Sequence, residues 1–290
     1  MQRSGHRDIG KSGNQTRWMV VLLTFLAFGT RVTWGQDPPL QQAKTVSAAP
    51  EGIPRDLARF RAQQLKDIRY QLSYTITPKT DFISGHEELR FAQNADDRGI
   101  LPEWLDFRDG SISKLTINGQ SAATDILNGH VILPADLLKV GENVVEIDFT
   151  ANVAPAGKAI TRFDDKDDGS EYIYTLFVPM DADMAFPCFD QPDLKARFRL
   201  EVFAPEDWTV ISNSRPFGIG GGGGPGQVRT VFNETKPIST YLFAFAAGPF
   251  RPVHFDMNLP GLYVRKSKLQ KAEAEAAAVQ QITADGIKYL

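Results

Sequence analysis

The chain repeats a two-residue pattern of apolar and polar positions in many short segments between residues 67 and 248. In the first segment, apolar side chains occupy every second position over 68–76, which is typical of a strand with one buried face. Asn118-Gly119 and Asn128-Gly129 each separate two apolar runs, and Asn-Gly favours a tight hairpin because both residues tolerate positive φ. The segments that carry a strand pattern are 67–77, 86–91, 111–120, 124–133, 143–151, 172–178, 195–204, 208–214, 227–234 and 239–248. The pattern predicts a mainly β fold, a β-sandwich or paired curved sheets.

Two segments favour helices instead. A short helix is predicted within 53–65. After residue 266 apolar residues recur at helical spacing in an Ala- and Glu-rich stretch, and Ser267 with Gln270 predicts a capping box. The sequence stops at Leu290 with no turn residues after this helix. We therefore expect 259–290 to be the start of a second domain that the chain does not complete.

The N-terminus has the pattern of a targeting segment. A basic head precedes an uncharged, mostly apolar run over 18–29, which is the length of a signal-peptide core and short for a membrane span. We expect residues 1–35 to be a signal peptide cleaved before Gln36, and 36–54 to be a flexible leader. A single membrane anchor is the alternative. The predicted location is periplasmic or extracellular, with no stable membrane span after cleavage and with membrane association left open.

Composition narrows the class of protein. A formal net charge of −3 gives no indication of nucleic-acid binding, which needs a basic face. Cys188 is the single cysteine, so it forms no disulfide within the chain. Its neighbours Phe186, Pro187 and Phe189 favour a buried hydrophobic role over that of a nucleophile.

No catalytic constellation emerges from spacing. The sequence HEELR at His86 lacks the second histidine of H-E-x-x-H and lies in a strand pattern, so it predicts no metal site. The glycine-rich segment 217–226 lacks G-K-[ST] and is interpreted as a hairpin loop. The acidic segment 164–169 lacks EF-hand spacing, which favours a solvated loop over a calcium site.

Several motifs nevertheless occur in a recognisable order. FPCFDQPDLKARF, residues 186–198, resembles the F-P-C-x-D-E-P-x-x-K-A-x-F pattern of the aminopeptidase N family of zinc metallopeptidases. WTVISN at 208–213 and PISTYLFAFAAGPF at 237–250 are similar to two later patterns of that family, and Tyr70 to Leu72 with Phe82 to Gly85 is similar to its opening pattern. The resemblance covers about residues 55–290.

The resemblance implies an architecture and an activity. Residues 55–258 would form a saddle-like N-terminal β-domain, and 259–290 would begin a thermolysin-like catalytic domain. The family's Zn²⁺ ligands lie in that later domain, so this chain would contain no catalytic or metal-binding residue and would be inactive alone. Its implied partners are peptide substrates and its own C-terminal catalytic domain. The whole protein would hydrolyse peptide bonds near peptide N-termini.

One departure from the family concerns substrate recognition. The family has T-Q-x-E-P-x-D-A-R-R before F-P-C, and its Gln and Glu line the specificity pocket. Here Leu176 and Val178 occupy those two positions, and Asp183 and Met184 replace the Arg pair. Leu176 and Val178 are therefore the candidate substrate-binding residues, in an apolar pocket wall. The alternative is that both continue the preceding strand and face the core.

The remaining acidic residues have competing interpretations. Asp181 or Asp183 could supply the missing negative charge, although Asp181 is also predicted to cap a turn. Asp190 and Arg197 are predicted to form a structural ion pair. Two other functions remain open: a non-catalytic binding or scaffold protein derived from the same family, and a free-standing β-sandwich that binds peptide or glycan.

Overall fold

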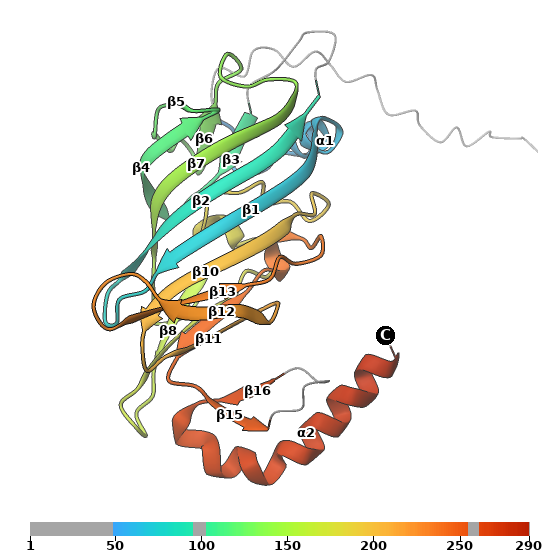
Figure 1. Cartoon of the computed structure of the whole chain (residues 1–290). Helices are drawn as coiled ribbons and strands as arrows, with labels where there is room; N and C mark the ends of the chain where they lie inside the picture. Colours follow the sequence, from blue (N-terminus) through green and yellow to red (C-terminus); the bar gives the residue numbers. More distant parts are fainter. Residues whose placement is uncertain (1–48, 95–102, 255–260, 290) are drawn as a thin grey trace, which may run out of the picture. The chain divides into compact units, whose positions relative to one another are not determined.

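The strand-forming segments assemble mainly into one large sheet, in the spatial order β12-β13-β10-β1-β2-β7-β4-β5 (Figure 1). The structure is a computed structural model that describes residues 49–94, 103–254 and 261–289, all within one compact unit. β1 and β10 run parallel, and the other neighbours in this sheet are antiparallel. The strands are β1 (Leu65–Thr75), β2 (Phe82–Gln93), β4 (Gly110–Ile117), β5 (Gln120–Ser121), β7 (Gly141–Asn152), β10 (Arg197–Pro205), β12 (Pro216–Gly221) and β13 (Gln227–Phe232).

Three smaller sheets complete the described strands. A four-stranded sheet has the order β11-β14-β9-β8, and two-stranded sheets are formed by β15-β16 and β3-β6. Their strands are β3 (Glu103–Asp106), β6 (His130–Leu133), β8 (Ile160–Asp164), β9 (Glu171–Thr175), β11 (Thr209–Ser212), β14 (Phe245–Gly248), β15 (Arg251–His254) and β16 (Leu262–Val264). The mainly β prediction is confirmed.

The helical segments are few. The predicted N-terminal helix is confirmed as α1 (Arg55–Gln64), and the C-terminal one as α2 (Leu269–Tyr289). Single 3-10 turns are η1 (Ala182–Met184), η2 (Thr240–Leu242) and η3 (Lys266–Lys268). The predicted strand 239–248 is thus only partly correct, because η2 occupies its first half.

Both Asn-Gly hairpins are confirmed by the backbone. Asn118 and Gly119 have φ of 51° and 82°, and Asn128 and Gly129 have φ of 52° and 81°. These left-handed values are what a two-residue turn requires. The glycine-rich segment also forms a hairpin, between β12 and β13, although its first glycines belong to β12 itself.

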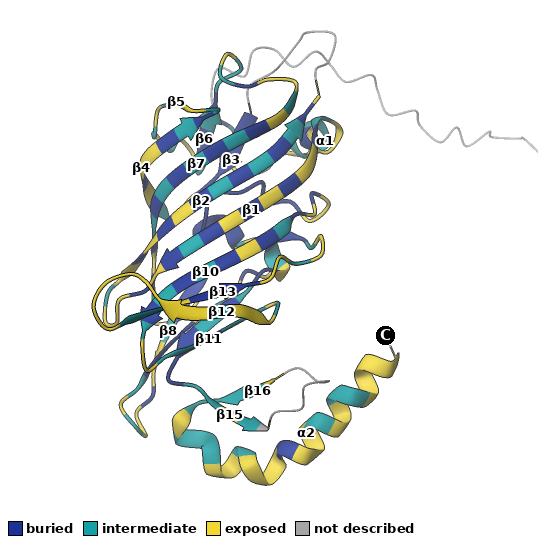
Figure 2. Cartoon of the chain, viewed as in Figure 1, coloured by how far each residue is buried: buried dark blue, intermediate teal, exposed yellow. Residues whose placement is uncertain are grey.

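The alternating pattern places one face of the large sheet in the core (Figure 2). Tyr70 and Phe198, on neighbouring strands, stack with their ring centroids 5.0 Å apart, and Phe198 stacks on Phe243 at 4.7 Å. The hydroxyl of Tyr70 accepts a hydrogen bond from the backbone N–H of Phe189, and that of Tyr74 donates one to the carbonyl of Ala185. The two tyrosines therefore hold the segment around FPCF against the sheet.

The acidic segment 164–169 has a structural role that the sequence did not predict. Asp165 is buried and accepts hydrogen bonds from Arg265 at 3.0 Å and from the Ser267 hydroxyl at 2.7 Å, and Asp167 pairs with Lys268. The solvated-loop prediction is therefore wrong for Asp165. The capping-box prediction is also wrong, because Ser267 lies in η3 and its hydroxyl bonds Asp165.

Some predictions fall on residues outside the described ones. These are the signal peptide 1–35, the leader up to residue 48 and the domain boundary at 258/259. Within the described helices, none has both the length and the apolar character needed to cross a membrane.

Candidate functional site

The segment that follows β9 exposes three apolar side chains. Leu176 and Val178 are each 58 % exposed and Met180 is 48 % exposed, while Phe177 between them is buried. The Phe177 ring lies 6.1 Å from that of Phe186 and 6.4 Å from that of Phe243. The alternative that Leu176 and Val178 continue the strand into the core is therefore wrong, because β9 ends at Thr175 and both side chains lie at the surface.

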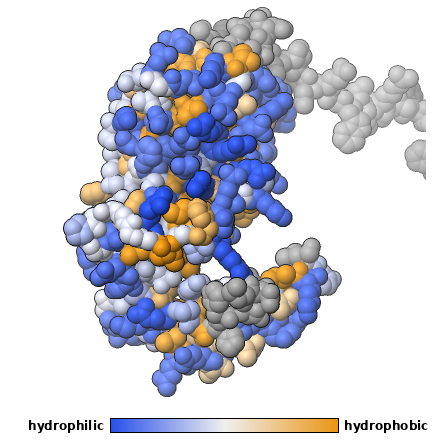
Figure 3. Space-filling view, in the orientation of Figure 1, coloured by the Kyte–Doolittle hydropathy of each residue, from blue (hydrophilic) through white to orange (hydrophobic). Residues whose placement is uncertain are grey.

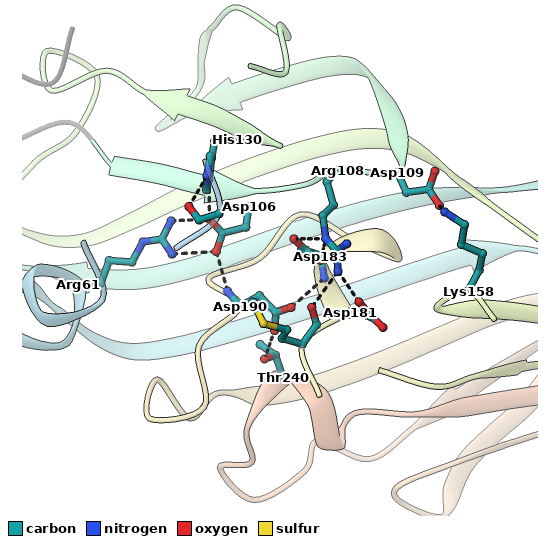
Figure 4. A network of polar contacts seen from close by, with 12 residues as sticks. Arg61, Asp106, Arg108, Asp109, His130, Lys158, Asp181, Asp183, Asp190 and Thr240 are labelled. Carbon is teal, nitrogen blue, oxygen red and sulfur yellow. Dashed lines mark hydrogen bonds and ion pairs between the residues drawn. The ribbon is translucent and has the colours of Figure 1, made fainter. Parts of the chain in front are cut away.

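Arg108 fixes the next few residues of this segment (Figure 4). Its Nε donates to both carboxylate oxygens of Asp183, at 2.8 and 2.9 Å, and one Nη donates to the carbonyl of Met180 at 3.0 Å. The same Nη also donates to the carboxylate of Asp181. Asp181 is the residue before η1 but makes no side-chain capping bond, so the turn-cap prediction is wrong. A single guanidinium thus holds both carboxylates.

Burial perturbs the Asp183 carboxyl. Desolvation raises its pKa to about 7, against the hydrogen bonds and charge of Arg108, which lower it. The nearby carboxylates of Asp190 and Asp106 also raise this pKa, and the value of about 7 includes their effect. Arg108 is therefore the group that favours the ionised form of Asp183. The ionised carboxylate in turn keeps the segment bound to Arg108.

A second, fully buried network lies beside the Arg108 contacts (Figure 4). Asp106, at the end of β3, accepts hydrogen bonds from both Nη atoms of Arg61 at 2.7 and 2.8 Å and from the N–H of Asp190 at 2.9 Å. Nδ1 of His130 lies 2.8 Å from the same carboxylate. These partners keep the pKa of Asp106 below its ordinary value although burial alone would raise it. The network joins α1, β3, β6 and the FPCF segment.

Asp190 connects this network to η2. Its Oδ1 accepts a hydrogen bond from the Thr240 hydroxyl at 2.6 Å, and its Oδ2 from the N–H of Asp183 at 3.3 Å. Arg197 instead lies 3.8 Å from Glu234. The predicted Asp190–Arg197 ion pair is therefore wrong for the described residues, since each has a different partner.

Cys188 is completely buried, and burial raises its pKa well above the ordinary value. Its backbone N–H donates to the carbonyl of Asp106 at 2.9 Å, and its own carbonyl accepts from the N–H of Asp106 at 2.8 Å. The prediction of a buried hydrophobic residue is confirmed. A protonated thiol without solvent access is not a nucleophile.

The described residues do not fit a metal ion. Across 49–94, 103–254 and 261–289, no group of three or more His, Cys, Asp or Glu side chains is arranged to hold one. His86 lies on β2 and its Nδ1 contacts Asp148 of β7 at 2.6 Å, in an exposed cross-strand pair.

The order of these parts matches a known family. The sequence pattern described as the peptidase M1 N-terminal domain matches residues 66–242, which include all of β1 but its first residue, the FPCF segment and η2. The chain belongs to this family. Its closing residue, Leu242, is the end of η2, so the buried network and the exposed segment both lie within the matched region apart from Arg61.

Several proteins similar to this chain are described as aminopeptidases. The chain is 32 % identical over 196 residues to aminopeptidase N of Streptomyces lividans, covering 64 % of this chain and 22 % of that protein. It is 33 % identical over 203 residues to aminopeptidase M1-D of Oryza sativa subsp. japonica, covering 67 % of this chain and 22 % of that protein. It is 41 % identical over 102 residues to the probable M1 family aminopeptidase 1 of Encephalitozoon cuniculi, covering 34 % and 12 %. The chain thus spans about a fifth or less of the length of these relatives.

Sequence reasoning located the segment but missed what positions it. Arg108 and Arg61 lie in ordinary-looking stretches, and each meets its carboxylate partners only through contacts 45 or more positions away. No pattern within a short stretch of sequence indicates that residues so far apart form a pair. The one available clue was the excess of aspartates around FPCF, which implied cationic partners elsewhere in the chain.

Proposed function

We propose that this chain is the N-terminal β-domain of an exported zinc-dependent aminopeptidase, and that residues 176–180 face the N-terminal end of its peptide substrates. The observation that supports this most is the exposed apolar segment itself, held by Phe177 and Arg108 on a family domain found in aminopeptidases. Apolar side chains left at a fixed surface position are typical of an interaction site.

The proposed recognition is apolar. Leu176 and Val178 carry no charge, and the carboxylates of Asp181 and Asp183 are both bound by Arg108. Neither Asp is therefore available to pair with a substrate ammonium group. A charged hydrogen bond of this kind contributes about 1.5–3 kcal/mol. We infer that the segment selects apolar groups of the peptide over its free amino group.

We place the proposed zinc site outside the described residues, because these hold no group of His, Cys, Asp or Glu side chains that fits a metal ion. The proposed partner of this chain is a catalytic domain in the same protein, as the length of the relatives suggests. No nucleic-acid partner is proposed.

The proposed function is tested on the complete gene product. It should release the reporter from aminoacyl-coumarin substrates, lose this activity on treatment with a chelator, and regain it when Zn²⁺ is added. The purified 290-residue chain, assayed alongside, should release none. Absence of hydrolysis by the complete product, with intact folding by circular dichroism, would overturn the enzyme proposal and favour the non-catalytic scaffold.

The export proposal has its own test. Expression in the native host followed by fractionation should place the protein outside the cytoplasm, with Gln36 as its first residue. A cytoplasmic product that retains residues 1–35 would contradict it.

A further inference from the structure

The two edges of the eight-stranded sheet differ in kind. At one edge, β5 has only two residues, whereas at the other β12 has six and, among the described strands, pairs with β13 alone. An edge strand presents unpaired backbone N–H and C=O groups to which another strand can hydrogen-bond. Native edges are usually blocked by charged side chains, prolines or bulges, and short strands serve the same purpose.

β12 lacks most of this protection. Its sequence, PFGIGG, has no charged residue, and Pro216 and the register irregularity next to it lie at the start of the strand. Phe217 is 56 % and Ile219 is 70 % exposed. The remaining length is thus an uncharged, accessible edge.

The glycines of β12 are not required by the fold. A Cβ added to Gly218, Gly220 or Gly221 would meet no atom within 4 Å, and none of the three has a left-handed φ. Glycine inside a strand is destabilising, because it loses the most conformational freedom on folding. This differs from Gly223 and Gly226 in the turn, whose φ values of 93° and 74° do favour glycine. The glycines of β12 are thus better explained by access of another strand to the backbone than by packing within the domain.

A cationic group lies beside this edge. Gly218, Gly220, Phe217 and the arginines Arg199 and Arg229 line a groove of about 300 Å³. The guanidinium of Arg199 lies over the Phe217 ring, 5.6 Å from its centroid, and within the described residues it has no carboxylate partner. Arg229, in contrast, donates to Glu201 at 2.6 Å. Figure 3 shows hydrophobic and strongly hydrophilic side chains side by side over β12 and β13.

We propose that β12 binds an extended peptide segment of a partner protein, which adds to the sheet as a ninth strand and places an acidic side chain against Arg199. Main-chain hydrogen bonds to the open edge provide the affinity, and alternate side chains of the added strand face opposite sides of the sheet. On the side of the groove, charge complementarity to the Arg199 guanidinium, which has no carboxylate partner among the described residues, selects Asp or Glu. On the other side, exposed Ile219 selects an apolar residue. This proposal does not depend on the proposed enzymatic function.

The probe is a fluorescein-labelled peptide of alternating Glu and Val, titrated with the purified 290-residue chain and measured by anisotropy. We expect saturable binding that Arg199→Ala weakens about tenfold. The matched control is Arg69→Ala, which removes an exposed arginine from the same face on β1, two strands further in than β13, and should change affinity less than twofold. Thermal midpoints of both variants should equal that of the parent chain, since both side chains are exposed.

Two further probes test the mode of binding. The same peptide N-methylated at alternate residues lacks half of its backbone donors and should not bind, and a Lys-Val peptide should not bind either. No binding of the Glu-Val peptide at 1 mM would overturn the proposal, as would equal losses in the two arginine variants or undiminished binding of the N-methylated peptide. If sedimentation shows that the chain pairs with itself through β12, the occupant of this edge is a second copy of the chain and not a partner peptide.

Discussion

Two neighbouring regions of this domain invert the usual distribution of side chains. Around Asp106 and Asp190, charged groups are buried and hydrogen-bonded to one another (Figure 4), whereas over 176–180 apolar groups are exposed. The buried charges are compensated, because their oxygens have cationic, N–H or hydroxyl partners. The exposed apolar side chains are not covered by other residues of the described chain. The first region fixes the backbone, whereas the second leaves apolar side chains at the surface, where the proposed function assigns them to substrate binding.

The largest effect expected is from breaking the buried region. Asp106→Ala leaves the Arg61 guanidinium buried without its carboxylate, and removal of one partner of a buried pair costs about 3–5 kcal/mol. Urea unfolding monitored by tryptophan fluorescence measures the change. Asp148→Ala is the matched control, since Asp148 pairs with His86 across strands at the surface, where such pairs contribute about 1 kcal/mol or less. Equal losses in the two variants would contradict the distinction between the regions.

A second effect concerns pH. Glu103 is buried, and burial raises its pKa from 4.5 to about 8, although the charge of Arg61 and the hydrogen bond from Gln93 lower it. The folded state therefore keeps a proton that the unfolded state loses above pH 4.5. The free energy of unfolding should fall by about 1.4 kcal/mol per pH unit between about pH 5 and 8 from this group. Glu103→Gln should flatten that slope, measured by urea unfolding at several pH values, and an unchanged slope would contradict the assignment.

A smaller effect is expected at the junction of the two regions. Arg108→Ala removes the donor that holds Met180, Asp181 and Asp183, so the amides of 181–186 should exchange with deuterium about tenfold faster. Arg90→Ala is the control, because Arg90 also bonds two carboxylates at the surface but lies on β2. Exchange at 181–186 should be unchanged in that variant. Unaltered exchange in Arg108→Ala would show that Phe177 alone fixes the segment.

The smallest effect is expected from the exposed region itself. Leu176→Ser and Val178→Ser should each change the free energy of unfolding by about 0.5 kcal/mol or less, because both side chains are more than half exposed. Phe177→Ala, at the buried position between them, should cost about 3–5 kcal/mol. A loss from either serine variant that approaches the Phe177 value would place that side chain in a packed contact.

The sequence predicted some of this contrast and missed the rest for identifiable reasons. Period-two alternation located β1, β2, β7 and β10, because a strand with one buried face must alternate. The same rule failed after Thr175, where buried Phe177 between two apolar neighbours keeps the pattern of a fully buried strand while the chain has already left the sheet. Alternation alone does not reveal where a strand of the four-stranded sheet ends.

The polar network was beyond prediction for a different reason. Arg61 meets Asp106 from a helix whose sequence has no unusual feature, and Asp190 meets Thr240 across 50 positions. Long-range pairs of this kind depend on the packing of α1 and η2 against the sheet. The aspartates were visible in the sequence, but their partners were not.

The measurement that tests the central claim most directly uses Val178→Glu in the complete gene product, with Val178→Gln as the uncharged control. If 176–180 faces the N-terminal end of the peptide, the new carboxylate should raise kcat/KM for free-amine peptides relative to N-acetylated ones by about tenfold or more, as a charged hydrogen bond of 1.5–3 kcal/mol implies. The Gln variant should leave this ratio within twofold of the parent. An unchanged ratio in the Glu variant, with activity retained, would show that the exposed segment does not meet the substrate's amino terminus.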